Sequence, residues 1–208
     1  MTRIAIIICL IFITGCASTS SIPLLQKYGS LPEGYGIVAV ATGRNEVSGI
    51  SFSNLSFVSY HVMKKNPVGE LERVKFLPAE PGAPKYPLGN LGKGKYGFLH
   101  IFEMPIGEYF LIGQEGRGSS VVVAGGGAFG VFDEGLSATG IAFKFDVKPA
   151  QVNYLGEILN VDDNLVTSSM QLSNLLTRDK ATALKMSKEL SGIPFEFTPV
   201  KPLTRSAM

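Results

Sequence analysis

Two histidines and a few carboxylates are the side chains best suited to chemistry in this chain of 208 residues. His61 and His100 are the only histidines, and each lies in a stretch whose apolar residues alternate as in a strand. Two imidazoles with a carboxylate such as Glu103 can bind zinc, but nothing in their spacing places them together. A histidine in a strand usually makes a local hydrogen bond, so we expect no metal site.

Carboxylates are a second source of chemistry, because two positioned carboxyl groups suffice for glycoside hydrolysis. Glu103, Glu108, Asp146 and Glu157 all fall within predicted strands, where solvated strand faces explain them more simply. Serines are plentiful, but no Gly-x-Ser-x-Gly motif of a serine hydrolase is present. A hydrolase that acts through a carboxylate or a serine therefore stays an alternative hypothesis.

Glycine-rich and acidic stretches resemble ligand loops without their full patterns. Gly125, Gly127 and Gly130 spell Gly-x-Gly-x-x-Gly, but no helical pattern follows to hold a pyrophosphate. Residues 162 to 164 are better explained as a turn, because the alternating oxygen ligands of a calcium loop are absent. We expect no cofactor, neither a nucleotide nor a metal ion.

The two cysteines, Cys9 and Cys16, lie at the amino end of the chain. A basic residue, Arg3, precedes an apolar run that ends in small residues, as in a secretory leader. The run is too short to span a membrane comfortably, since a spanning helix needs about 20 apolar residues. An ordinary signal peptide with an accidental cysteine, or a short buried core segment, is the alternative.

The tetrapeptide Ile13-Thr14-Gly15-Cys16 resembles the lipobox of bacterial lipoprotein leaders, with isoleucine in place of the more usual leucine. The resemblance implies that residues 1 to 15 are a signal peptide, that Cys16 carries diacylglycerol on its thiol, and that the new amino terminus is acylated. Several acyl chains hold a soluble domain at a membrane, whereas one chain binds only marginally. The partner implied is thus the membrane, through lipid on Cys16.

Ala17 and Ser18 follow the cysteine, rather than the aspartate that usually retains such a protein at the inner membrane. The resemblance therefore implies the cell outer membrane, with the domain facing the periplasm. Cys9 would leave with the leader and Cys16 would be capped, which excludes cysteine nucleophiles, cysteine-rich zinc sites and redox pairs. Loss of Arg3 lowers the formal net charge from +2 to about +1, so we expect no nucleic acid partner.

Composition divides the rest of the chain into a tether, a domain and a tail. Residues 16 to 35 are rich in serine and then in proline and glycine, which predicts a lipidated, flexible tether with a reach below about 60 Å. Residues 36 to 200 suit a single domain with a full-size core. Residues 201 to 208 are expected to form a C-terminal tail.

Period-two alternation dominates the predicted domain. The stretches GFLHIFEM and EYFLIG, joined by Pro105-Ile106-Gly107, predict a hairpin, and EYFLIG has the two apolar faces of a central strand. In QVNYLGEIL, we expect Val152, Tyr154 and Ile158 on one face and a bulge at Gly156. The clearest strand is IAFKFDVKP, with Ile141, Phe143, Phe145 and Val147 opposite Lys144, Asp146 and Lys148. Other strand candidates are GIVAVAT, LSFVSYHVM, LERVKFL, SVVVA and FEFTPV, which begin at Gly36, Leu55, Leu71, Ser119 and Phe195.

One good helix candidate begins near Thr177, which we expect to cap it, with Asp179 in its first turn. Apolar residues a heptad apart mark its buried face, and Gly192 with Pro194 ends it. These residues are Leu176, Ala183 and Leu190. The predicted fold is mainly β: an antiparallel β-sandwich of the prealbumin or immunoglobulin type, with this single C-terminal α-helix beside it.

Two signatures resemble a group of small bacterial lipoproteins with a transthyretin-like or carboxypeptidase-regulatory-like β-sandwich, a domain of unknown function. They are MPIGEYFL, residues 104 to 111, and FKFDVKPAQVNYLGEI, residues 143 to 158. Ala150 stands where the family pattern has glycine, so its turn is expected to be of type I or locally strained. The resemblance implies a fold and a location, not a reaction.

The leading hypothesis is therefore a non-enzymatic, membrane-anchored lipoprotein with a binding or structural role in the cell envelope. Its loops or a strand edge would meet an envelope protein partner. The alternative is the envelope hydrolase.

Overall fold

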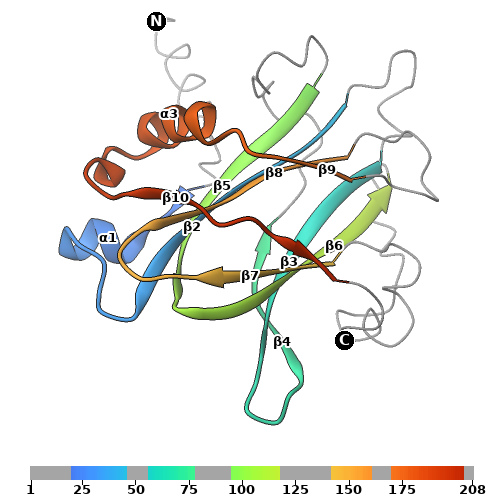
Figure 1. The fold of residues 1–208 in the computed structure, drawn as a ribbon, viewed down its shortest axis with the longest axis horizontal. Coiled ribbons are helices and arrows are strands. Elements are labelled where there is room, and N and C mark those ends of the chain that lie inside the picture. Colours follow the sequence, from blue (N-terminus) through green and yellow to red (C-terminus); the bar gives the residue numbers. More distant parts are fainter. Residues whose placement is uncertain (1–19, 46–55, 78–94, 118–141, 161–169, 204–208) are drawn as a thin grey trace, which may run out of the picture.

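The structure is a computed structural model that describes residues 20–45, 56–77, 95–117, 142–160 and 170–203. Two β-sheets pack face to face, and helices cover the outer face of one of them (Figure 1). The prediction of a mainly β chain with two packed sheets and few helices is confirmed. No helix of the described residues is both long and apolar enough to cross a membrane.

The sheet under the helices, called sheet A, has the strand order β1-β5-β2-β8-β10, with β9 also pairing with β8. Its strands are β1 (Ser20–Ser21), β2 (Tyr35–Asn45), β5 (Lys95–Pro105), β8 (Val152–Asn160), β9 (Met170–Ser173) and β10 (Phe195–Phe197). Three pairs are parallel, namely β1 with β5, β2 with β8, and β8 with β10. The prediction of an entirely antiparallel sandwich is therefore wrong for this sheet.

The second sheet, called sheet B, has the order β11-β7-β6-β3-β4, and all its described pairs are antiparallel. Its strands are β3 (Ser56–Lys65), β4 (Leu71–Leu77), β6 (Gly107–Arg117), β7 (Ala142–Val147) and β11 (Lys201–Pro202). Lys201 and Pro202 pair with β7, so the expected C-terminal tail begins as an edge strand instead. Figure 1 shows the β3–β4 hairpin projecting away from the helices.

The core between the sheets follows the predicted alternation. Phe143, Phe145 and Val147 of β7 are buried there, while Asp146 is exposed, as expected for a strand with one face in the core. Strand β6 is buried on both faces, with Tyr109 and Leu111 inward and Phe110 and Ile112 outward. The prediction that this strand is central is confirmed by its place between β7 and β3.

The predicted hairpin at Pro105-Ile106-Gly107 is wrong, because β5 belongs to sheet A and β6 to sheet B. The chain changes sheets at Ile106, whose N–H donates to the carbonyl of Gly34 at 2.8 Å. The hydroxyl of Tyr109 donates to the carbonyl of Pro105 at 2.9 Å and holds this corner. Strand β5 is apolar on both faces, so it needs cover on both sides, which a place inside sheet A provides.

The turn from β7 to β8 also crosses between the sheets. Ala150 lies there at a φ of 55°, the left-handed region that favours glycine. The sequence predicts either a type I turn or local strain at Ala150. A type I turn is ruled out, because both of its central residues have negative φ, so the turn is locally strained.

Helices α1 (Pro23–Tyr28) and α3 (Leu176–Met186), with the short 3₁₀ helix η3 (Lys188–Leu190), form a layer on the outer face of sheet A. Ala183 and Leu190 are buried against the sheet, and Leu176 packs beside them, which confirms the predicted apolar face. Thr177 does not cap α3, because the helix begins one residue earlier and Asn174 Oδ1 accepts the N–H of Leu176 at 3.2 Å.

The expected flexible tether is corrected over residues 20 to 34, which fold onto the domain. Ser20 and Ser21 pair with β5, and Ile22 and Leu25 are 1% and 2% exposed. Pro23 suits the first turn of α1, since proline has no N–H to leave unpaired there. Glu103 accepts the N–H groups of Leu24 and Leu25 at 2.9 and 2.6 Å, which satisfies two free donors of the helix.

Candidate functional site

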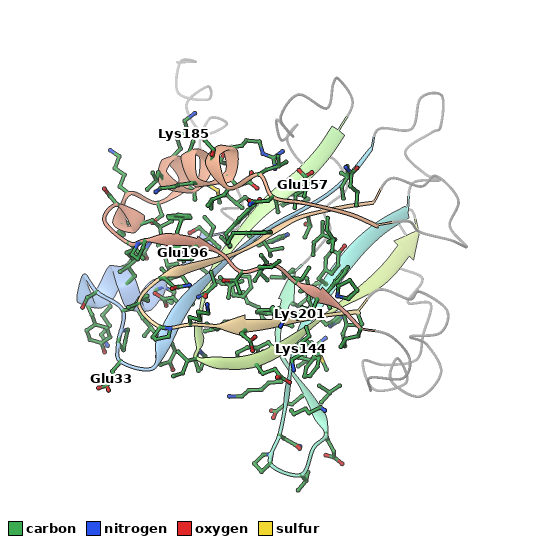
Figure 2. All side chains as sticks on the ribbon, viewed as in Figure 1. Glu33, Lys144, Glu157, Lys185, Glu196 and Lys201 are labelled. Carbon is green, nitrogen blue, oxygen red and sulfur yellow. The ribbon has the colours of Figure 1, made fainter. Side chains whose placement is uncertain are left out.

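Four polar side chains meet beneath α3 and form what we call the α3 clamp: Tyr154, Glu157, Arg178 and Asp179. Tyr154 and Glu157 belong to β8, whereas Arg178 and Asp179 lie in the first turn of α3. Glu157 is 0% exposed and Asp179 1% exposed. Figure 2 labels Glu157 on the side of sheet A that faces α3.

A β-bulge brings both side chains of β8 to the same face. Ala39 pairs with Tyr154 and Ala41 pairs with Glu157, so β8 has one residue more than β2 between these two pairs. Gly156 lies in this interval at a φ of 101°, which confirms the predicted bulge. Without the extra residue, Glu157 would point between the sheets. The bulge also turns Ile158 into the sandwich core, so its predicted place beside Tyr154 is wrong.

Arg178 joins the two carboxylates of the clamp. Its Nη2 donates to Glu157 Oε2 at 2.8 Å, and its Nε donates to Asp179 Oδ1 at 2.7 Å. Nη2 also lies 3.1 Å from Asp179 Oδ2, so the guanidinium holds Asp179 through two nitrogens. The hydroxyl of Tyr154 donates to the same Oδ2.

The electrostatics of the clamp follow from burial and charge. Burial raises the pKa of Tyr154, and the hydrogen bond to Asp179 raises it further, so Tyr154 stays a neutral donor. Burial opposes the charged form of Arg178, but its hydrogen bonds to Asp179 and Glu157 raise its pKa overall. One guanidinium thus binds both buried carboxylates, and Glu157 Oε1 has no hydrogen-bond partner among the described residues.

This arrangement is suited to fixing helix α3 in place rather than to catalysis. Tyr154, Glu157 and Asp179 are buried, the side chain of Arg178 is 15% exposed, and each of the four is hydrogen-bonded to another member of the clamp. Arg178 and Asp179 on α3 bind Glu157 and Tyr154 on β8, so the clamp sets where α3 lies on sheet A. The pattern predicted an apolar helix face here. Arg178 was not singled out from the sequence, Tyr154 was predicted only as part of a strand face, and the adjacent Arg178-Asp179 pair at a helix start was the available signal.

The two histidines lie apart, on different sheets and in different surroundings. His100 of β5 faces the sandwich core, where its Nε2 lies 3.0 Å from Thr42 Oγ1. Burial, and then the charge of Lys75, lowers the pKa of His100 to about 4. His61 of β3 points to the outer face of sheet B, with its ring centroid 5.0 Å from that of Phe76. Among the described residues no group of three histidine, cysteine or carboxylate side chains is placed to hold a metal ion.

The predicted carboxylates are found in three separate places. Glu103 caps α1 and Glu157 belongs to the α3 clamp. Glu108 and Asp146 are directly opposite on β6 and β7, on the outer face of sheet B. Both are exposed, and Glu108 forms a salt bridge with Lys144. This pair is the one that the structure brings together, and it lies on an open sheet face without a surround that excludes water.

Several predicted features lie outside the described residues. They are the signal peptide at residues 1 to 15, the lipid attachment at Cys16, the strand candidate SVVVA from Ser119, the glycine-rich stretch at 125 to 130 and the turn at 162 to 164. No family model matches this chain, and no curated protein or solved structure matches it either. The resemblance to transthyretin-like lipoproteins therefore stays a prediction.

Proposed function

We propose that this chain is a lipid-anchored protein of the bacterial outer membrane, facing the periplasm, with a binding or structural role that is not enzymatic. The observation that carries the proposal is the sequence Ile13-Thr14-Gly15-Cys16 at the end of an apolar leader, four positions before Ser20, the first residue of strand β1. A cysteine at this place joins a domain to acyl chains, which anchor it.

The hydrogen bonds that the described polar side chains make within the fold support a role without catalysis. Glu103 is engaged by the backbone of α1, Glu157 by Arg178, and His100 by Thr42. Of the carboxylates considered above, Glu108 and Asp146 are the two that lie opposite each other among the described residues, and both are exposed, with Glu108 in a salt bridge to Lys144. A general acid and base usually work in a site that excludes water, so this pair is poorly suited to the task.

Strand β4 is the described surface best suited to a protein partner. It is the last strand of sheet B in the described topology, and its Val74 and Phe76 are 46% and 47% exposed. A terminal strand offers backbone groups to which an extended segment of another protein can pair. A photocrosslinker at Phe76 should capture an envelope protein in intact cells, and one at the exposed Glu196 on sheet A should not.

The anchor itself is tested by metabolic labelling with palmitate in a bacterium that processes lipoproteins. Wild type and Cys9→Ser should carry the label and sediment with outer membranes, because Cys9 lies within the leader. Cys16→Ser should carry none. Label retained by Cys16→Ser, or absent from wild type, would refute the proposed function.

A further inference from the structure

The folded amino end makes the link to the proposed anchor short. Ser20 and Ser21 pair with β5, so the chain is held in the domain from Ser20 onward. Three residues separate Cys16 from Ser20, and the four extended steps between their Cα atoms reach at most about 14 Å. A sandwich with one helical layer is about 30 Å thick. The link is shorter than the domain, so a surface next to Ser20 has to face the membrane.

The helical layer is the surface that adjoins this end. Helix α1 begins three residues after Ser20, and it lies on the outer face of sheet A together with α3 and η3. Figure 1 shows α1 and α3 on the same side of sheet A, and the β3–β4 hairpin on the opposite side of the molecule. The link therefore starts beside the helices and away from the hairpin.

The charge of the helical layer fits an anionic surface. Its exposed charged side chains are four lysines and one glutamate: Lys27, Lys180, Lys185, Lys188 and Glu189. Arg178, whose side chain is 15% exposed, and the buried Asp179 are paired with each other in the α3 clamp. Figure 2 shows Lys185 on the outer side of α3, away from sheet A. Lysines near a membrane are attracted to its anionic lipids.

Tyr28 adds a side chain suited to the boundary between lipid and water. Its side chain is 58% exposed, and Lys27 Nζ lies 4.9 Å from the centre of its ring. Tyrosine is enriched at membrane interfaces, where its ring meets the headgroups and its hydroxyl meets water. Lysine can extend its stem along such a surface and keep its charge in water.

Sheet B lacks this uniform charge. The exposed charged side chains described on the strands of sheet B are of both signs: Lys64, Lys65, Arg73 and Lys201 with Glu72, Glu108 and Asp146. A surface of mixed charge gains little from anionic lipid. Charge thus favours the same surface as the length of the link.

We propose that the layer of α1, α3 and η3 lies against the membrane that holds the lipid on Cys16, with its lysines on anionic phospholipid headgroups. This inference rests on the proposed function. It directs the β3–β4 hairpin away from the bilayer, toward a partner.

The orientation is tested on the full, processed chain in vesicles of phosphatidylethanolamine and phosphatidylglycerol at 3:1, with a nitroxide on a fraction of the headgroups. Single cysteines at Gln26, Ala181 or Val68 carry a fluorescent probe, and all three positions are exposed. Quenching should be at least threefold greater at Gln26→Cys and Ala181→Cys than at Val68→Cys. Equal quenching at the three positions, or greater quenching at Val68→Cys, would overturn the orientation.

The role of charge is tested in the Ala181→Cys background. Lys180→Glu, Lys185→Glu and Lys188→Glu together should reduce quenching at least twofold. The matched control, Lys64→Glu, Lys65→Glu and Lys148→Glu, changes the net charge equally at exposed positions of sheet B and its turn. It should leave quenching unchanged, and an equal loss in both triple variants would overturn the headgroup contact.

Probe labelling and lipid mass of the wild-type chain distinguish a failure of the proposed function from a failure of the proposed orientation. Its thiols should be absent, since Cys9 leaves with the leader and Cys16 is capped, so the probe should not attach to it. If the probe attaches and no lipid mass is found, the proposed function fails, and the orientation fails with it. If lipid is present but quenching is uniform, only the orientation fails.

Discussion

The two sheets share one core but differ on their outer faces. On sheet A, helices bury a second apolar cluster that includes Leu25, Tyr154 and Leu190, together with two carboxylates and a guanidinium. On sheet B, the outer face has a smaller cluster of Met63, Phe110 and Ile112, with exposed charges around it.

The difference follows from the side chains that each sheet turns outward. Strand β2 presents Ile37, Ala39 and Ala41 to the helices, and small apolar side chains let a helix approach closely. The outward positions of β6 and β7 include Glu108 and Asp146, which favour water. A helical layer forms over the small apolar face, and the charges trapped beneath it then have to be paired.

The largest effect is expected from removal of the cation beneath α3. Arg178→Met leaves Glu157 and Asp179 buried without their counter-ion, and breaking a buried ion pair costs about 3 to 5 kcal/mol. Urea unfolding of the full chain measures the loss. Lys180→Met, on the same helix but exposed, should cost less than about 0.5 kcal/mol. A similar small cost for both variants would remove the distinction between the two faces.

The docked amino end is expected to contribute the next largest effect. Leu25→Ala empties a site in the cluster beneath the helices and should lower the free energy of unfolding by about 2 to 5 kcal/mol. The hairpin on sheet B supplies the control, since Val68 is 79% exposed and Val68→Ala should be nearly neutral. If Leu25→Ala is also neutral, residues 20 to 34 behave as the flexible tether that composition predicted.

Local alternation was enough to predict most strands but not their partners. The stretch LERVKFL matches β4 in both bounds, and the strand at Phe143 has the predicted faces. The same signals predicted a hairpin at Ile106, where the chain instead changes sheets. A turn motif predicts that the chain changes direction, but not that the two flanking strands pair with each other. Whether the next strand pairs with the last one depends on distant strands such as β2 and β3.

The α3 clamp could not be predicted because it depends on a bulge and on contacts distant in sequence. Gly156 predicted the bulge, but its consequence for Glu157 depends on the pairing of β8 with β2. Arg178 lies 21 residues from Glu157, and the helix start alone does not indicate this contact. The short helix α1 was missed because Pro23 at its start and Gly29 after its end are equally typical of a linker.

A third prediction concerns the inner side of sheet A, where His100 faces sheet B. Its folded pKa of about 4 lies below the ordinary value of 6.5, so the fold favours the neutral ring. The stabilisation is complete above pH 6.5 and is lost as the pH falls toward 4. This loss is on the order of 3 kcal/mol.

The measurement is urea unfolding at several pH values between 7 and 4. His100→Gln should lose much less stability on acidification than wild type. An unchanged acid dependence in His100→Gln would show that the interior between the sheets is not the acid-sensitive part.

The smallest effect is expected where the chain passes from sheet B to sheet A. Ala150 holds a φ of 55° in that turn, and the left-handed region costs a residue with a Cβ about 1 to 2 kcal/mol. Glycine removes this cost but loses more freedom on folding, so Ala150→Gly should stabilise the chain by about 1 kcal/mol at most. Ala181→Gly in the exposed part of α3 is the matched control, because it should destabilise by about 1 kcal/mol. Opposite signs of the change in the free energy of unfolding for the two Ala→Gly variants would show that the turn between the sheets is strained and the helical layer is not. Equal signs would contradict strain at Ala150.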